Sequence, residues 1–275
     1  MTENIDKQVV AGFGDEWSRF DQSELSKDEL EQMFDNYFNI FPWEKLSAEA
    51  VGFDLGCGSG RWAKMVAPRV GKLHLIDASE EALAVARRNL QGADNCEFHL
   101  ASVDEIPLPD NSCDFGYSLG VLHHIPDTQG GLRACVAKLK SGAPFLLYLY
   151  YRFDNRPVWF RAIWRTSELA RSVVARLPHT LRYAVSQILA AIIYFPLART
   201  AKVSEKLGMN VENFPLSQYR HNSFYVMRND SLDRFGTQLE KRFTKAEIRE
   251  MMEQAGLENI TFSKTSFWTA VGFKK

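Results

Sequence analysis

The sequence is poor in cysteine. Its 275 residues include 4 cysteines, and no two of them form a Cys-x-x-Cys pair. Disulfide frameworks and thiol-based zinc sites usually show closely spaced cysteines. Three of the four, Cys57, Cys113 and Cys135, fall in segments that we expect to form the core. We therefore predict free thiols in a reducing compartment. We also predict no metal site, since no other group of ligand-type residues has a recognisable spacing.

The sequence also lacks a long apolar run. Its first residues, Met1–Lys7, show no apolar leader. The longest apolar stretch, Ile188–Ala198, is shorter than the roughly 20 residues that cross a bilayer, and Pro196 interrupts it. We find no internal repeat and no low-complexity tract. We therefore expect a folded cytoplasmic protein.

A bias toward charge of one sign is missing as well. The chain has 33 Lys and Arg against 34 Asp and Glu, which gives no reason to expect a nucleic-acid partner. The local distribution is less even, because residues 150–206 hold ten Lys or Arg and three Asp or Glu. Such an asymmetry can indicate an anionic partner or an anionic surface.

A glycine-rich turn is the most informative feature that is present. Val51–Leu55 is predicted to be a buried strand, Gly56–Gly60 a tight turn, and Arg61 the start of a helix reaching about Pro68. Glycines at every second position allow backbone conformations that other residues avoid, and they let a ligand approach the main chain closely. Free amides at the start of a helix favour negative charge such as a carboxylate.

The turn is compatible with two nucleoside cofactors. A dinucleotide fingerprint, G-x-G-x-x-G, counted from Gly56 would need its third glycine at position 61, which is Arg61. Asp77 closes the next predicted strand, Lys72–Ile76, and an acid at this distance can accept hydrogen bonds from both ribose hydroxyls. Asp77 suits either cofactor. The missing glycine disfavours an NAD-dependent oxidoreductase, which we keep as an alternative.

Strands and helices then alternate, as in a parallel sheet covered on both faces. Further strands are predicted at Glu97–Leu100, within 113–127, and at Ala143–Tyr150. Helices are predicted at Glu80–Leu90 and Thr128–Leu139. A helix over 244–256 and a hairpin of Ile260–Ser263 with Phe267–Phe273 end the chain.

These motifs together resemble one enzyme family. Asp-x-Gly-x-Gly-x-Gly at 54–60 is similar to motif I of the class I S-adenosylmethionine-dependent methyltransferases. The loop 101–112 and Leu-His-His-Ile-Pro-Asp at 122–127 resemble segments of the small-molecule members of that family. The resemblance implies an α/β fold with a Rossmann-like seven-stranded, mostly parallel sheet, an antiparallel last strand and a helical cap insertion. It also implies S-adenosyl-L-methionine as cofactor.

The resemblance assigns roles to residues of the core. Asp54 would support the turn, Gly56, Gly58 and Gly60 would hold the methionine part, and Asp77 with Ala78 would hold the ribose. Ser102 and Val103 would contact the adenine, and Leu119 would contact the cofactor through its backbone. Ser102 stands where the family more often has an aspartate, and its hydroxyl could accept the same hydrogen bond from the adenine.

Four segments follow from this reading. Residues 1–48 would be helical and cover the cofactor site, and 49–150 would be the cofactor-binding core. Residues 151–235 would form a helical cap over the substrate, and 236–275 would complete the core. Phe13, Trp17 and Phe20 in the first segment would either cover the sheet or close over the cofactor.

The candidates for catalysis are two pairs of residues. His123 and His124 follow the fourth strand at the edge where such sheets bind ligands, so either could be a general base or could line the pocket. Tyr219 and His221 lie in the cap and could contact or deprotonate the acceptor. A polar surface loop would explain the second pair equally well.

The expected activity is methyl transfer to an oxygen, nitrogen or carbon atom of a small acceptor. The arginine-rich amphipathic helices of the cap suit a bulky apolar or anionic molecule, a peripheral contact with a membrane, or a homodimer interface. A protein that uses the cofactor for other chemistry, or that only binds it, is a further alternative.

Overall fold

The computed structural model describes residues 4–265 and 267–275. It divides into two compact units. The first runs to Gln22 and adds Leu30–Arg152 and Leu239–Lys275, and the second comprises Ser23–Glu29 and Phe153–Gln238. All four cysteines are free thiols.

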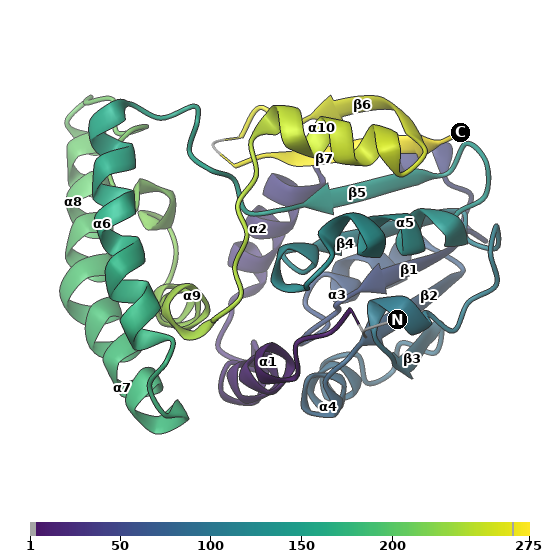
Figure 1. The fold of residues 1–275 in the computed structure, drawn as a ribbon, viewed down its shortest axis with the longest axis horizontal. Coiled ribbons are helices and arrows are strands. Elements are labelled where there is room, and N and C mark those ends of the chain that lie inside the picture. The colour runs from purple at the N-terminus through teal and green to yellow at the C-terminus, as the bar shows by residue number, and fades with distance from the viewer. Residues whose placement is uncertain (1–3, 266) are drawn as a thin grey trace. The chain divides into compact units, whose positions relative to one another are not determined.

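A seven-stranded sheet forms the first unit, with strand order β3-β2-β1-β4-β5-β7-β6 (Figure 1). Strands β1 to β5 pair in parallel, whereas β7 is antiparallel to both β5 and β6. This topology confirms the predicted fold class. The strand bounds are β1 Val51–Leu55, β2 Lys72–Asp77, β3 Cys96–Leu100, β4 Phe115–Leu119, β5 Pro144–Tyr148, β6 Leu257–Phe262 and β7 Thr269–Lys274.

Each face of the sheet buries its own apolar cluster, because successive residues of a strand point to opposite faces. Phe53 of β1 and Leu147 of β5 lie in one cluster, which α5 and α10 cover. Leu73 of β2 and Phe115 of β4 lie in the other, under α2, α3 and α4. The helix bounds in this unit are α1 Lys7–Arg19, α2 Lys27–Phe38 (in the unit from Leu30), α3 Ala63–Val66, α4 Glu80–Asn89, α5 Thr128–Lys138 and α10 Lys245–Gln254.

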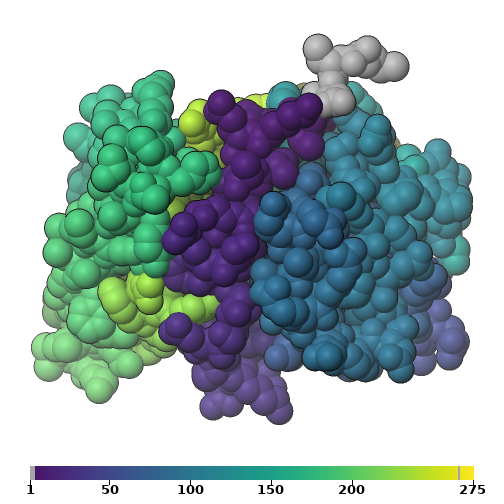
Figure 2. All heavy atoms as spheres, turned by 90° about the horizontal axis from the view of Figure 1, so that it is seen from below, coloured from purple at the N-terminus to yellow at the C-terminus, as the bar shows by residue number. Residues whose placement is uncertain are grey.

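Helix α1 places the N-terminal segment beside the ligand-binding edge of the sheet. Asp6 caps it, with its carboxylate accepting from the amides of Gln8 and Val9 at 2.9 and 3.1 Å. The helix then packs against α4, and Figure 2 shows the purple N-terminal residues against the blue of that region.

Helices form the second unit: α6 Val158–Val174, α7 His179–Leu189, the π-helix η5 Ala190–Tyr194, α8 Phe195–Lys206 and α9 Phe224–Gly236. Helix α9 packs against α6, α7 and η5. Val174, Tyr194 and Met227 belong to the small apolar cluster that these elements share. Short 3-10 turns complete both units.

The prediction that Pro196 interrupts the apolar stretch is wrong. Residues His179–Lys206 form one continuous helix, because the wide π turn lets the amide of Phe195 bond to the carbonyl of Ala190. The wider turn accommodates a proline ring that would clash in a regular α-helix. Within the described residues, this helix passes a length-and-composition test for crossing a membrane.

Candidate cofactor and active site

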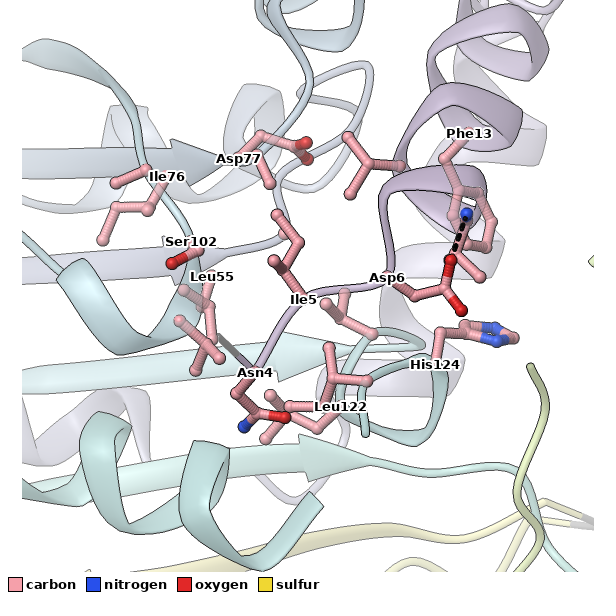
Figure 3. Close-up of a pocket in the computed structure, with 18 of the residues that line it drawn as sticks. Asn4, Ile5, Asp6, Phe13, Leu55, Ile76, Asp77, Ser102, Leu122 and His124 are labelled. Carbon is pink, nitrogen blue, oxygen red and sulfur yellow. Dashed lines mark hydrogen bonds between the residues drawn. The ribbon is translucent and has the colours of Figure 1, made fainter. Parts of the chain in front are cut away.

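A cavity opens at the carboxyl ends of β1, β2 and β4 in the first unit, where open α/β sheets bind ligands. Figure 3 shows that its walls come from the segments after these strands and from the N-terminal residues. Predicted cofactor residues in the lining are Gly56, Asp77, Ala78, Ser102, Val103 and Leu119. Asp54, Gly58 and Gly60 do not line it.

The glycine turn has the backbone that its sequence predicts. Gly56, Gly58 and Gly60 have φ of +74°, +52° and +74°. The amides of Gly56 and Cys57 donate to the carbonyl of Ile76 at 2.7 and 3.2 Å, which ties the turn to β2. A Cβ atom at Gly56 would lie 2.3 Å from Cγ2 of Val121. The close approach of the loop after β4 therefore excludes a side chain at this position.

The helix after the turn is shorter than predicted. Instead of a helix from Arg61 to about Pro68, the chain forms α3 and a 3-10 turn, Ala67–Arg69. A helix of one turn has little macrodipole. The predicted contribution of a helix dipole to carboxylate binding is therefore small.

Asp77 lines the cavity and also accepts a hydrogen bond from the glycine turn. Its Oδ2 accepts from the amide of Gly58 and its Oδ1 from the amide of Ser79, both at 2.9 Å. Burial raises the pKa of this carboxyl, and the backbone amides oppose that rise. Each carboxylate oxygen can accept more than one hydrogen bond, so Asp77 can also receive hydroxyls from a ligand in the cavity.

Asp54 lies behind the turn, 1% exposed on β1. Burial raises the pKa of this carboxyl from 3.8 to about 8. Near neutral pH the group is therefore predominantly protonated. A neutral acid inside the apolar layer fits a role in supporting the turn.

The N-terminal segment supplies a wall of the cavity, and of the three aromatic residues expected to cover the sheet or close over the cofactor, Phe13 and Trp17 lie in this wall and Phe20 does not. Ile5, Val9, Phe13 and Trp17 line the cavity. Asn4 anchors this wall: its amide donates to Oδ2 of Asp104 at 2.6 Å. Its side chain exchanges two hydrogen bonds with the backbone of Asp127, at 2.6 and 2.8 Å. The local signals for this wall are the capping residue Asp6 ahead of an amphipathic helix and the aromatic residues Phe13 and Trp17.

The two adjacent histidines have different environments. His123 is fully buried, and its ring centroid lies 3.9 Å from that of Tyr150. Burial lowers the pKa of His123 well below its usual range, so the ring is neutral. It does not line the cavity.

His124 lines the cavity beside Phe13, with ring centroids 5.0 Å apart. Its Nδ1 lies 2.7 Å from the carbonyl oxygen of Leu239. A carbonyl can only accept, so Nδ1 is the donor in this hydrogen bond. Within the described part of the chain, Nε2 has no hydrogen-bond partner. Of the two histidines, His124 is therefore the one that lines the cavity.

Tyr219 and His221 belong to the second unit and do not line this cavity. The ring of Tyr219 lies 5.5 Å from that of Tyr194, and burial raises the pKa of its hydroxyl. Nε2 of His221 lies 2.8 Å from Glu205, which also pairs with Arg220. Both residues thus have structural contacts within the cap helices.

A group of metal-ligand types that spacing does not reveal lies on strands β2 and β3. His74, Glu97 and His99 have their potential ligand atoms within 4.8 Å of one another. Lys72 already pairs with Glu97 at 2.5 Å, and the two imidazoles contact each other at 3.0 Å. None of these residues lines the cavity.

The residues of the cavity fit a nucleoside that carries an amino acid. Gly56 lets a ligand approach the main chain without side-chain obstruction, and Asp77 offers acceptors for sugar hydroxyls. Ser102 can bond to a base edge, and Ile76 and Val103 give the apolar surface against which a base stacks.

Comparison with known proteins agrees with this fit. Residues 53–147 match the family described as methyltransferase domain. An uncharacterized methyltransferase of Bacillus subtilis is 31% identical over 106 residues, 38% of this chain and 42% of that protein. A demethylmenaquinone methyltransferase of Listeria welshimeri is 36% identical over 121 residues, 41% of this chain and 50% of that protein. Phosphoethanolamine N-methyltransferase 2 of Caenorhabditis elegans is 32% identical over 35% of this chain and 23% of that protein. This chain spans half or less of the length of these curated relatives.

Solved structures share the fold. A Thermotoga maritima protein, described as an S-adenosylmethionine-dependent methyltransferase and possible histamine N-methyltransferase, aligns with a TM-score of 0.53. The alignment covers 96% of this chain and 100% of that chain at 15% identity. Haemonchus contortus phosphoethanolamine N-methyltransferase 2, solved with S-adenosylhomocysteine, aligns with a TM-score of 0.51. The alignment covers 94% of this chain and 43% of that chain at 16% identity.

Proposed function

We propose that the chain is a class I S-adenosylmethionine-dependent methyltransferase, as the match of residues 53–147 to the methyltransferase domain supports, and that it transfers the methyl group of this cofactor to a small-molecule acceptor. One observation carries the proposal: the carboxylate of Asp77 is held by the amide of the glycine turn at the mouth of a cavity built for a nucleoside. The bound cofactor supplies an electrophilic methyl group on a positively charged sulfur.

The protein's residues bind and orient in this proposal. Gly56 lies beside the amino-acid part with no side chain to obstruct it, Asp77 receives the ribose hydroxyls, and Ser102 with Val103 holds the adenine. The N-terminal wall excludes water with Ile5, Val9 and Phe13. Displacement at an activated carbon requires alignment and a dry site above all, which these residues supply.

His124 is the general base in this proposal. Its Nε2 accepts the proton that a hydroxyl acceptor releases as the methyl group is transferred, while the bond from Nδ1 to Leu239 holds the ring in place. An amine acceptor would lose its proton without such help. Buried, neutral His123 supports the ring of His124 at a centroid distance of 4.0 Å. Tyr219 and His221 stay candidates for contact with the acceptor.

The acceptor is proposed to be a small molecule with a bulky apolar part. Two relatives carry names that refer to a quinone and to phosphoethanolamine, one apolar and one anionic. The apolar lining of the cavity and the many exposed apolar side chains of the second unit favour the first kind. The methylated atom would be oxygen, nitrogen or carbon.

Calorimetry with S-adenosylhomocysteine and with NADH tests the proposal. We expect binding of the first alone, and we expect Asp77→Asn to weaken it at least about tenfold, the effect of losing about 1.4 kcal/mol from charged hydrogen bonds. The matched control is Asp94→Asn, an exposed acid outside the cavity. Binding of NADH in place of the methyl donor's product would show an oxidoreductase. Binding of the product without transfer to any of a panel of apolar and anionic acceptors, using labelled cofactor, would show a protein that does other chemistry.

A further inference from the structure

On two helices of the second unit, α6 and His179–Lys206, charged side chains are packed against α9 while many apolar side chains are exposed. In a helix on the surface of a soluble protein, the apolar stripe faces the core and the charged residues face water. Here the largest exposures of apolar side chains fall on α6 and on the continuous helix of α7, η5 and α8.

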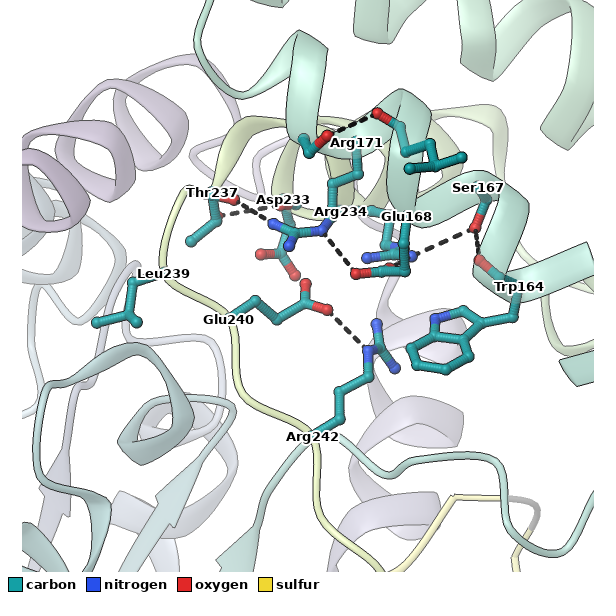
Figure 4. A network of polar contacts seen from close by, with 12 residues as sticks. Trp164, Ser167, Glu168, Arg171, Asp233, Arg234, Thr237, Leu239, Glu240 and Arg242 are labelled. Atoms are coloured by element: carbon teal, nitrogen blue, oxygen red, sulfur yellow. Dashed lines mark hydrogen bonds and ion pairs between the residues drawn. The ribbon is translucent and has the colours of Figure 1, made fainter. Parts of the chain in front are cut away.

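Helix α6 shows the reversal clearly. Glu168 pairs with Arg171 of the same helix and with Arg234 of α9 (Figure 4). Arg171 also donates to the carbonyl of Thr237 at 2.8 Å. These charges are part of the packing against α9. The opposite side carries exposed apolar residues, among them Leu169 and Val173, which are 69% and 63% exposed.

The long helix repeats the arrangement. Arg182 is 7% exposed and donates to the carbonyl of Gly236, and the carbonyl of Ser186 accepts from Ser231. About one and a half turns beyond η5, Arg199 donates to the carbonyls of Arg220 and Asn222. The helix also exposes apolar residues over most of its length: Leu181, Ile188, Ile192, Ile193 and Val203.

The polar contacts exclude a spanning orientation for the folded unit. A helix that crossed the bilayer would carry Arg182, Ser186 and Arg199, with their partners on α9 and in the loop before α9, through the hydrocarbon layer. Charged groups there are costly. A helix that lies parallel to the surface can keep this polar side in water and bury only its apolar side.

The charges of these helices suit an anionic surface. Residues 158–206 contain six Arg and two Lys against two acids, Glu168 and Glu205. Each of the two acids is held in ion pairs, with Arg171 and Arg234 and with Arg220 and His221. Arg165, Arg176 and Lys206 are exposed. Basic residues near an anionic leaflet add about 1 kcal/mol each to binding.

We propose that the outward faces of α6 and of the helix His179–Lys206 dock the protein on an anionic lipid bilayer, with both helices lying in the interfacial plane. Docking does not depend on methyl transfer, so either proposal can fail without the other. For an apolar acceptor, it would deliver the enzyme to the phase in which that acceptor is dissolved.

Flotation of the full chain with vesicles tests docking. The vesicles consist of phosphatidylcholine with or without phosphatidylglycerol. We expect binding to the anionic vesicles, reversal by high salt, and a loss of about tenfold or more for Ile188→Glu with Ile192→Glu, since burial of each isoleucine is worth about 1.5–3 kcal/mol. Leu100→Glu makes the same change at an exposed apolar residue of β3, and this control should bind normally.

Charge reversal gives a second, independent arm. Arg165→Glu with Arg176→Glu should weaken binding to anionic vesicles several-fold, whereas Arg88→Glu on α4 should not. Absence of binding to both kinds of vesicle would overturn the proposal, as would equal binding to both. A dimer by light scattering that dissociates in the Ile188→Glu, Ile192→Glu variant would assign the face to a second copy instead. Protein released only by detergent would show a spanning helix and also overturn it.

Discussion

Asp54 is a carboxyl group that the fold keeps in its protonated form. Its pKa in the folded protein is about 8, against 3.8 for an ordinary aspartate, because burial disfavours the charge. The folded state therefore binds this proton more tightly than the unfolded state does. Folding stability contributed by this group falls as the pH rises from about 4 to about 8.

Asp54→Asn should remove this pH-dependent cost. We expect the variant to gain little at pH 4 and to exceed the parent in Tm increasingly up to pH 8, by about 2–4 °C for each kcal/mol in a chain of this size. Thermal unfolding followed by circular dichroism across this range measures the gain. Asp94→Asn should show a flat difference, and a flat difference for Asp54→Asn would mean that its carboxyl is already ionised in the folded protein.

One substitution can distinguish the proposed catalytic role of His124 from its structural role. Asparagine at this position can still donate to the carbonyl of Leu239 from its amide, but it has no group in place of Nε2. With a hydroxyl acceptor, we expect His124→Asn to lower kcat about 10²–10⁴-fold and to leave the affinity for S-adenosylhomocysteine unchanged. Single-turnover transfer of labelled methyl and calorimetry give the two quantities. A kcat within a factor of about two of the parent would leave His124 as a wall residue only.

At the scale of elements, the N-terminal wall depends on a few hydrogen bonds far from its own helix. The side chain of Asn4 makes two of them, with the backbone of Asp127. Neutral hydrogen bonds contribute about 1 kcal/mol each. Loss of this clasp would therefore let α1 move away from the cavity more often.

Asn4→Ala should speed the release of cofactor. We expect the dissociation rate of S-adenosylhomocysteine to rise about 5–30-fold, the factor that corresponds to one or two kcal/mol, with stopped-flow fluorescence of Trp17 as the measurement. Asn39→Ala, at an exposed position on the end of α2, is the control. An unchanged rate would mean that the wall does not have to open for release.

Local patterns predicted the central elements well. Strand β1 has the predicted bounds, and β2 and α4 differ from prediction by one residue each, because apolar periodicity and capping residues act within a few positions. Elements that depend on distant contacts were predicted less well. The helix after the glycine turn is shortened, and β6 begins at Leu257 instead of Ile260.

The same distinction applies to the candidate site. Gly56 and Asp77 could be found from the sequence because the turn and the strand end are local features. The wall built on Asn4 could not, since its partners lie 100 and 123 residues away. The different environments of His123 and His124 also could not, because burial and the carbonyl of Leu239 distinguish them.

At the scale of the whole molecule, the cofactor cavity lies within one unit and the outward apolar faces lie within the other. Amphipathic periodicity predicted helices over 151–235 but not which side they expose. A pattern of spacing is the same whether the apolar stripe faces a core or a lipid surface. Only the ion pairs of Glu168 and the buried Arg182 show that the polar side faces inward.

Hydrogen exchange should show that the cofactor and the vesicles each protect amides of a different unit. Saturation with S-adenosylhomocysteine should protect amides of the glycine turn and of residues 4–17, because a ligand stabilises the segments that enclose it. Amides of α6 and of His179–Lys206 should change only when anionic vesicles are added. Protection of both units by the small molecule alone would contradict this separation and point to cooperative unfolding of the chain.

Because of the π turn at Ala190–Tyr194, the orientation of the second half of this helix depends on the exact number of residues in the turn. Deleting one residue there would restore regular winding and rotate everything after it by about 100°. Arg199 would then leave the carbonyls of Arg220 and Asn222, and Val203 would turn away from its open side. In homologues that share this unit, insertions and deletions should therefore avoid the segment, while substitutions among apolar residues remain tolerated.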